Sequence, residues 1–162
     1  MASFDAQRRQ LFHFTRKDEK LPLRPPWALE ESLFQEACTR CGDCLESCPE
    51  SILQRESPHG YPTVNFQKGE CTFCKQCVDV CPINALNLLV TPLWSAKAII
   101  KDACLTQQGV ICSTCAEQCD EVAIQFTPEF GKVSQPILNI DACTGCGACV
   151  ASCPTQAIEV HA

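Results

Sequence analysis

Sixteen cysteines stand out in this chain of 162 residues because most of them recur at one short, fixed spacing. The first, second and fourth sets follow the pattern C-x2-C-x2-C-x3-C-P, in which a proline comes directly after the fourth cysteine. These sets are Cys38, Cys41, Cys44 and Cys48; Cys71, Cys74, Cys77 and Cys81; and Cys143, Cys146, Cys149 and Cys153. The pattern is typical of [4Fe–4S] binding: three thiolates wrap one cube, and the fourth cysteine completes the cube of a partner motif.

The third set along the chain departs from this pattern. It consists of Cys104, Cys112, Cys115 and Cys119 at the spacing C-x7-C-x2-C-x3-C, and Asp120 stands where the other sets have proline. A degenerate site that binds metal poorly is the alternative here. Because all four cysteines are kept at positions that fit the repeat, we expect a cluster at this set too. The inserted loop, residues 105–111, would shield that cluster or contact a partner.

The crossed ligand pattern, combined with the chain order, predicts four [4Fe–4S] clusters in two modules. The expected ligand groups are Cys38, Cys41, Cys44 and Cys81; Cys71, Cys74, Cys77 and Cys48; Cys104, Cys112, Cys115 and Cys153; and Cys143, Cys146, Cys149 and Cys119. A nested arrangement, in which the first unit pairs with the fourth and the second with the third, stays open at this point.

Two other uses of cysteine are disfavoured. Disulfide-rich small proteins are usually secreted, and we expect no cleavable signal peptide in this chain. Zinc sites normally use two separated C-x2-C pairs rather than three cysteines at consecutive steps.

The cysteine sets lie in a repeat of about 33 residues, which predicts the elements that position them. Strand-like runs at 63–66, 98–100 and 137–140 precede the later sets, and apolar runs follow the fourth cysteine of each set. Each unit is therefore expected to be a strand, a cysteine loop, a short helix or turn after the Cys-Pro step, and a second strand. Small residues such as Gly42, Gly145, Gly147 and Ala148 suit close approach of the loop backbone to sulfur.

These elements predict an α+β fold: two tandem ferredoxin-like 2[4Fe–4S] modules with small sheets and short helices. We expect a basic N-terminal extension at 1–36, the first module at 37–90 and the second at 91–162. Trp27 and Phe34 are expected to pack onto the first module. Residues 5–14 have the pattern of a short amphipathic helix with Leu11, Phe12 and Phe14 on its apolar side.

Charge separates the leader from the rest of the chain. Residues 1–26 carry a formal net charge of +3, and residues 27–162 carry −9. The acidic body disfavours nucleic-acid binding, whereas the basic leader is either a solvated tail or a contact for an anionic partner. Arg8-Arg9 looks like part of a twin-arginine export signal, but polar residues follow at once. We therefore expect a cytoplasmic protein, and the absence of a long apolar stretch predicts no membrane span.

Motifs of independent catalysis are missing from the sequence. It contains no glycine-rich nucleotide loop and no nucleophile elbow, and His13, His59 and His161 lie outside the cysteine sets. Because a cubane takes up one electron with little rearrangement, no substrate pocket is required. We expect an electron-transfer protein and no enzymatic activity of its own.

Several of these features together resemble the NapF family of ferredoxin-type proteins, which belongs to the periplasmic nitrate reductase system. They are the four cysteine sets, the Arg8-Arg9 leader, the segment Arg24-Pro25-Pro26-Trp27 and the long third set. The resemblance implies that all sixteen cysteines are cluster ligands. It further implies a cytoplasmic accessory protein that binds the unexported nitrate reductase catalytic subunit and helps its cluster to mature, by cluster loading or by reduction. The alternative is an electron-transfer ferredoxin or a wire subunit of a larger oxidoreductase.

Overall fold

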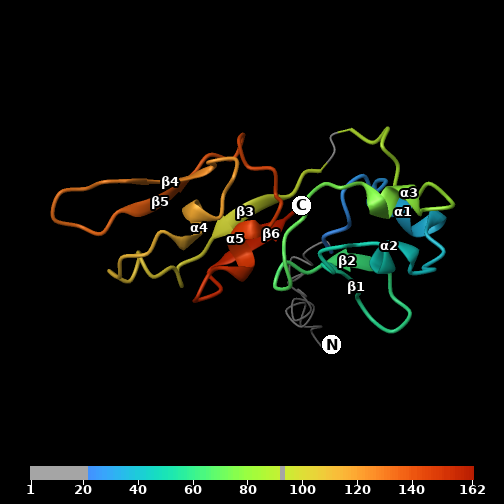
Figure 1. The fold of residues 1–162 in the computed structure, drawn as a ribbon, viewed down its shortest axis with the longest axis horizontal. Helices are drawn as coiled ribbons and strands as arrows, with labels where there is room; N and C mark the ends of the chain where they lie inside the picture. The colour runs from blue at the N-terminus through green and yellow to red at the C-terminus, as the bar shows by residue number, and fades with distance from the viewer. Residues whose placement is uncertain (1–21, 92–93) are drawn as a thin grey trace, which may run out of the picture.

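The computed structural model describes residues 22–91 and 94–162 and divides into two similar halves along its long axis (Figure 1). The first half contains α1 (Glu31–Ala37), α2 (Asp43–Glu46), β1 (Leu53–Arg55), β2 (Pro62–Val64) and α3 (Gln76–Asp79). The second half contains β3 (Lys97–Ile100), α4 (Thr114–Glu117), β4 (Ile124–Thr127), β5 (Gln135–Leu138), α5 (Ala148–Ala151) and β6 (Ile158–His161). Within the described residues, no helix combines the length and the apolar character needed to cross a bilayer.

Each of the four units contains a one-turn helix inside its cysteine set. The helices α2, α3, α4 and α5 each carry the third cysteine of a set and end two residues before the fourth. Of the two predicted alternatives after the Cys-Pro step, a short helix or a turn, the structure has the turn. In this turn the residue three positions after the fourth cysteine adopts a left-handed conformation and donates its N–H to the carbonyl of that cysteine. These residues are Ser51, Asn84, Val122 and Gln156, with φ between 49° and 53°.

The sheets are two-stranded and antiparallel. In each half a hairpin connects the two units: β1 pairs with β2, and β4 pairs with β5. In the second half, β3 also pairs with β6, so that the start and the end of this half lie together. The observed strands overlap the predicted runs at 63–66, 98–100 and 137–140 but begin one or two residues earlier.

The first half closes in a similar way without a regular sheet. Ala28 forms an isolated bridge with Leu86, Leu29 donates its N–H to the carbonyl of Ala85 at 3.1 Å, and Asn87 donates to Trp27 at 2.8 Å. The strand expected after the second cysteine set is therefore reduced to a bridge, because its partner is the short irregular segment before α1. That segment takes the place that β3 holds in the second half.

Trp27 and Phe34 pack onto the first half, as predicted. Phe34 is fully buried against Ala85 and Leu86. The Trp27 ring meets the Phe73 ring edge-on, with centroids 6.3 Å apart. The Arg8-Arg9 pair and the predicted helix at 5–14 lie outside the described residues.

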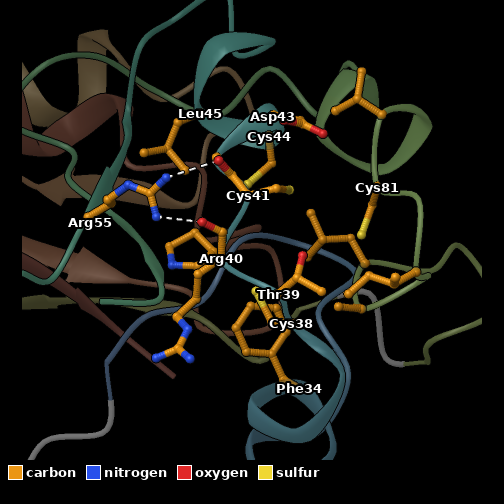
Figure 2. Close-up of a pocket in the computed structure, with 16 residues that line it drawn as sticks. Phe34, Cys38, Thr39, Arg40, Cys41, Asp43, Cys44, Leu45, Arg55 and Cys81 are labelled. Atoms are coloured by element: carbon orange, nitrogen blue, oxygen red, sulfur yellow. Dashed lines mark hydrogen bonds between the residues drawn. The ribbon is translucent and has the colours of Figure 1, made fainter. Parts of the chain in front are cut away.

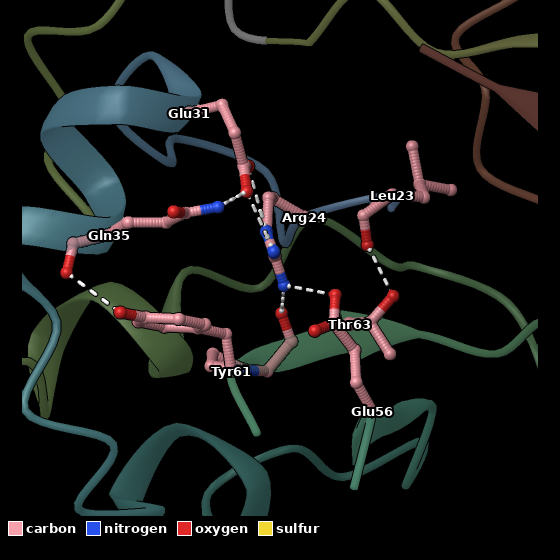
Figure 3. A network of polar contacts seen from close by, with 8 residues as sticks. Leu23, Arg24, Glu31, Gln35, Glu56, Tyr61 and Thr63 are labelled. Carbon is pink, nitrogen blue, oxygen red and sulfur yellow. Dashed lines mark hydrogen bonds and ion pairs between the residues drawn. The ribbon is translucent and has the colours of Figure 1, made fainter. Parts of the chain in front are cut away.

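Arg24 fixes the segment before α1 to the β1–β2 hairpin (Figure 3). Its Nε and Nη2 atoms donate to the two carboxylate oxygens of Glu31 at 2.9 and 2.7 Å. Its Nη1 atom donates to the carbonyl of Pro62 at 3.0 Å and lies 2.8 Å from the carboxylate of Glu56. A buried guanidinium with three partners makes this part of the chain an integral piece of the first half.

The apolar core is thin and contains cysteine side chains. Ile52, Leu53 and Phe66 of the first half share one buried group with Ile124 and Val150 of the second. Cys115, Cys143 and Cys149 belong to the same buried group. The cysteine loops therefore form much of the interior, and what fills the space between their sulfurs contributes to the fold.

Candidate metal centres

All sixteen cysteines line one of four pockets, four cysteines to each pocket. Site one is lined by Cys38, Cys41, Cys44 and Cys81, and site two by Cys48, Cys71, Cys74 and Cys77. Site three is lined by Cys104, Cys112, Cys115 and Cys153, and site four by Cys119, Cys143, Cys146 and Cys149. Every site thus combines three cysteines of one set with the fourth cysteine of a neighbouring set. This grouping pairs the first unit with the second and the third with the fourth, and the nested arrangement is not found. The role of the sulfurs as ligands remains a prediction.

Site one illustrates how the chain builds such a pocket (Figure 2). Cys38 and Cys41 lie in one loop, Cys44 lies in α2 directly after it, and Cys81 approaches from the opposite side. Arg55 holds the loop in place, because its guanidinium donates to the carbonyls of Arg40 and Cys41 at 2.8 and 3.1 Å. The carbonyls of two loop residues are thereby satisfied by Arg55, which also lines the site.

Left-handed residues flank the second cysteine in three of the four sets. The pairs are Arg40 and Gly42, Phe73 and Lys75, and Gly145 and Gly147. Successive turns of this kind point backbone N–H groups into a concavity that suits an anion, including an iron–sulfur cluster. Glycine alone would have identified only part of this pattern, since L-residues with a β-carbon rarely take this conformation.

The third set lacks this turn. Ser113, which follows its second cysteine, has φ of −135°, and Ile111 is not among the left-handed residues of the described chain. The seven-residue spacing before Cys112 gives the backbone a different path into site three. The inserted loop is buried only at its beginning, where Leu105 lines the site and Thr106 is buried, whereas residues 107–111 are exposed.

The thiols most deeply placed in these sites hold their protons strongly in the metal-free protein. Burial, reinforced by neighbouring cysteines, raises the pKa of Cys44, Cys77 and Cys149 to about 12. The pKa of Cys71 and Cys115 is raised to about 11, again chiefly by burial. A group of such thiols carries charge only when a strong Lewis acid replaces the protons, so metal binding releases protons here.

The donor chemistry of the four sites fits iron–sulfur clusters. Four cysteine thiols line each site, and no histidine is among the described residues that line them. Zinc would need its ligands to converge on one ion. Among the described residues no group of three or more His, Cys, Asp or Glu side chains does so. Cluster irons each take one cysteine sulfur, so four separated thiols around a cavity are the arrangement a cubane needs.

The sites follow one another in a row. Sites one and two meet through the contact between α2 and α3, and sites three and four meet through the contact between α4 and α5. The two halves are linked at sites two and four, where Cys71 donates its N–H to the carbonyl of Cys146 at 2.8 Å. The order along the molecule is therefore one, two, four, three.

Comparisons with known proteins identify the two halves and the whole chain. Two models described as "4Fe-4S dicluster domain" match residues 30–86 and 110–160. The chain is 43% identical to "Ferredoxin-type protein NapF" of Escherichia coli strain K12, over 97% of this chain and 95% of that protein. It is 47% identical to the protein of the same name from Haemophilus influenzae, over 90% of this chain and 82% of that protein.

The chain belongs to the NapF family of ferredoxin-type proteins. More distant similarity, at 32% identity, extends to "Ferredoxin-type protein NapG" of Escherichia coli, over 81% of this chain and 65% of that protein. The predicted family is thus confirmed. Two dicluster domains give this NapF-family protein four [4Fe–4S] clusters, which confirms the predicted cofactors.

Proposed function

We propose that this NapF-family protein supplies electrons to the periplasmic nitrate reductase catalytic subunit in the cytoplasm, before that subunit is exported. It does so as a carrier rather than as an enzyme. In this proposal the sixteen cysteines bind the clusters in the groups that line sites one to four. The proposed units are the modules at 37–90 and 91–162, together an α+β fold, and the extension at 1–36, whose residues from Arg24 onward pack on the first module.

The continuous row of sites is the observation that carries the proposal. Neighbouring sites share loops or contact each other directly, including the 2.8 Å hydrogen bond from Cys71 to Cys146 between the halves. An electron placed on any cluster then has a neighbouring cluster within the same protein. A row of this kind suits transfer from a donor at one end to an acceptor at the other.

The crossed grouping favours reduction of the partner over donation of a cluster to it. Site one, for example, is lined by Cys38, Cys41 and Cys44 of the first unit and by Cys81 of the second. Release of a cluster held in this way would remove a link between two units that also share the buried contacts of Phe34, Ala85 and Leu86. Electron supply leaves the fold intact.

The nitrate reductase partner is inferred from family membership and from the charge of the leader. Residues 1–26 are basic, while the remainder of the chain is acidic. The leader therefore offers a contact that the acidic body does not, and the proposed partner is the unexported catalytic subunit. A leader that carries Arg8-Arg9 but no following apolar stretch fits a protein that stays in the cytoplasm.

Anaerobic co-purification with the unexported catalytic subunit tests the partner. The full chain should retain the subunit, and a chain that begins at residue 22 should retain its iron but bind the subunit more weakly. The cut is placed before Arg24, Pro25 and Pro26 because these residues are buried in the first half. Failure of the full chain to bind the subunit would reject this partner.

The row of sites also favours a second candidate, a ferredoxin or a wire subunit of a larger oxidoreductase. The two functions differ in their effect on nitrate reductase. Loss of an accessory protein should leave the catalytic subunit poorly matured, whereas loss of a general carrier should leave it fully matured. Iron content and activity of the isolated catalytic subunit from cells without this protein distinguish the two.

A further inference from the structure

Three threonine hydroxyls contact cysteine sulfurs, and all three lie at site three. The Thr106 Oγ1 atom is 3.2 Å from the Cys104 sulfur. Thr114 lies 3.6 Å from the sulfur of Cys112, and Thr155 lies 3.8 Å from that of Cys153. No other cysteine sulfur in the described part of the chain has a hydroxyl contact of this kind.

The sequence repeats the same local arrangement at each of these positions. In all three cases threonine stands two residues after the cysteine, as C-x-T. None of the other thirteen cysteines is followed by threonine at that position. The cysteines come from two different units, so the pattern is defined by membership of site three and not by one stretch of sequence.

Ligation decides the direction of these hydrogen bonds. A cysteine bound to iron is a thiolate, which has no proton and can only accept. The Thr106 hydroxyl also donates to the Gln135 amide oxygen at 3.3 Å. Gln135 meanwhile donates its amide protons to the carbonyls of Thr106 and Val133. The Thr106 hydroxyl has one proton and two acceptors within reach, the Gln135 oxygen and the Cys104 sulfur. Once Cys104 is a thiolate, its negative charge makes it the stronger of the two acceptors.

These hydroxyls stand at the one site whose loop lacks the left-handed turn. At the other three sites left-handed residues flank the second cysteine, a conformation that suits backbone N–H groups for binding an anion. We propose that Thr106, Thr114 and Thr155 replace this backbone contribution and set the reduction potential of the cluster at site three. Hydrogen bonds to ligand sulfurs offset the extra negative charge of the reduced cluster, so they raise its potential.

The inference rests on the ligand groups proposed above and goes beyond them. Reduction adds one electron to the cluster, and no bond forms or breaks. The threonines act through the ligand sulfurs and are positioning residues. They would keep the last cluster of the row able to accept an electron from its neighbour at site four.

An anaerobic redox titration with dithionite, followed by EPR, tests this role on the full four-cluster protein. The Thr106→Val and Thr155→Val changes keep the side-chain shape and remove the hydroxyl. Together they should lower the equilibrium constant for reduction of one cluster at least tenfold. This is a fall of 59 mV in the reduction potential for one electron, and the potentials of the other three clusters should not change. Thr106→Ser and Thr155→Ser should restore the potential. Thr144→Val is the control, since Thr144 directly follows Cys143 but its hydroxyl contacts no sulfur in the described structure.

Cys115→Ser identifies the affected cluster independently, because Cys115 lines site three without a threonine contact. It should remove or alter the same EPR component that the valine variants shift. If the valine variants retain their iron and no potential moves, the inference is wrong. If they shift a component that Cys115→Ser leaves unchanged, it is also wrong. If Cys115→Ser leaves both the iron content and every EPR component unchanged, the ligand groups themselves are wrong, and the failure lies in the proposed function.

Discussion

The backbone N–H of Cys71 donates a 2.8 Å hydrogen bond to the carbonyl oxygen of Cys146. The two residues lie 75 positions apart in the chain and belong to different halves of the protein. This bond places the loop of site two against the loop of site four. It is one of the direct contacts between the two dicluster domains, beside the buried group that both halves share.

Phe66 packs against Gly147 at this junction. A β-carbon on Gly147 would lie 2.1 Å from the Phe66 ring, so Gly147→Ala should force the halves apart. Overpacking of this kind costs about 1 to 3 kcal/mol, and the magnetic coupling between the clusters at sites two and four should weaken. Anaerobic denaturation and EPR of the reduced protein measure the two effects.

Gly109→Ala is the matched control for this change. Gly109 has nearly the same backbone angle, with φ of +80° against +85° for Gly147, but nothing lies within 4 Å of the position that a β-carbon would take there. Both variants share the backbone strain, and only Gly147→Ala adds the clash. Equal destabilisation of the two variants would contradict the proposed junction.

The crossed grouping predicts an unusual pattern of iron loss in double variants. Cys38 and Cys81 line the same site, whereas Cys38 and Cys48 line different sites although they lie in one set. Cys38→Ser with Cys81→Ser should therefore lose one cluster, about four irons. Cys38→Ser with Cys48→Ser should lose two clusters, about eight irons.

Iron and acid-labile sulfide analysis under anaerobic conditions provides the count. The two double variants remove the same number of thiols, so a general effect of losing cysteines would lower the iron content of both equally. Equal iron loss would mean that the clusters are held within each set and that the crossed grouping is wrong.

Arg24→Met should destabilise the first half strongly. The change keeps the apolar stem but removes the guanidinium that pairs with Glu31 and Glu56. Removing one partner of a buried ion pair costs about 3 to 5 kcal/mol. Because both carboxylates remain partly open to water, we expect about 2 to 3 kcal/mol here. Lys132→Met, in an exposed pair with Glu129, should have little effect.

Glu31 gives the same network a defined pH dependence. Hydrogen bonding to Arg24 holds the pKa of the Glu31 carboxyl below its ordinary value of 4.5, and partial burial opposes this shift. The stabilisation by Glu31 is therefore complete above the ordinary pKa and is lost as pH falls through the lowered one. The stability difference between the wild type and Glu31→Gln should shrink in that acidic range. A difference that stays constant there would contradict the assignment.

Val122 is the least suitable of the four residues that form the turn after the fourth cysteine. It is β-branched, it has φ of 49° and it is exposed. Asparagine tolerates this conformation much better than valine does, so Val122→Asn should stabilise the second half by about 1 kcal/mol. Val110→Asn is the control, since Val110 is also exposed but is not left-handed. Thermal unfolding under anaerobic conditions should show a gain for Val122→Asn alone.

The cysteine spacing predicted groups of four that match the cysteines lining each pocket, while their role as ligands stays a prediction. Three thiolates at two-residue steps can surround only a compact object, and the fourth must reach another one. The strands were predicted within one or two residues because their apolar runs are short and distinct. The prediction of a second strand in the second unit was wrong. The segment that would pair with it, near Ala28, has no strand-like pattern.

Other features had no signal in the sequence. Arg40, Phe73 and Lys75 are left-handed because the loop requires that conformation, although none of them favours it. The contact of Phe66 with Gly147 depends on how two separately closed halves pack, and no local pattern records this. The turn was one of two alternatives predicted after Cys-Pro, and the helical turn around the third cysteine had no signal of its own.

The bridge between Ala28 and Leu86 determines where the protein can be cut. A fragment that started at residue 37 would contain every cysteine of sites one and two, yet it would lack the chain that covers Leu86 and the Phe34 side chain that fills the space beneath. Such a fragment would expose the unpaired backbone at Leu86 and an apolar cavity, and it would tend to aggregate when produced alone. An isolated first ferredoxin should instead start near residue 22, ahead of its own metal-binding motif.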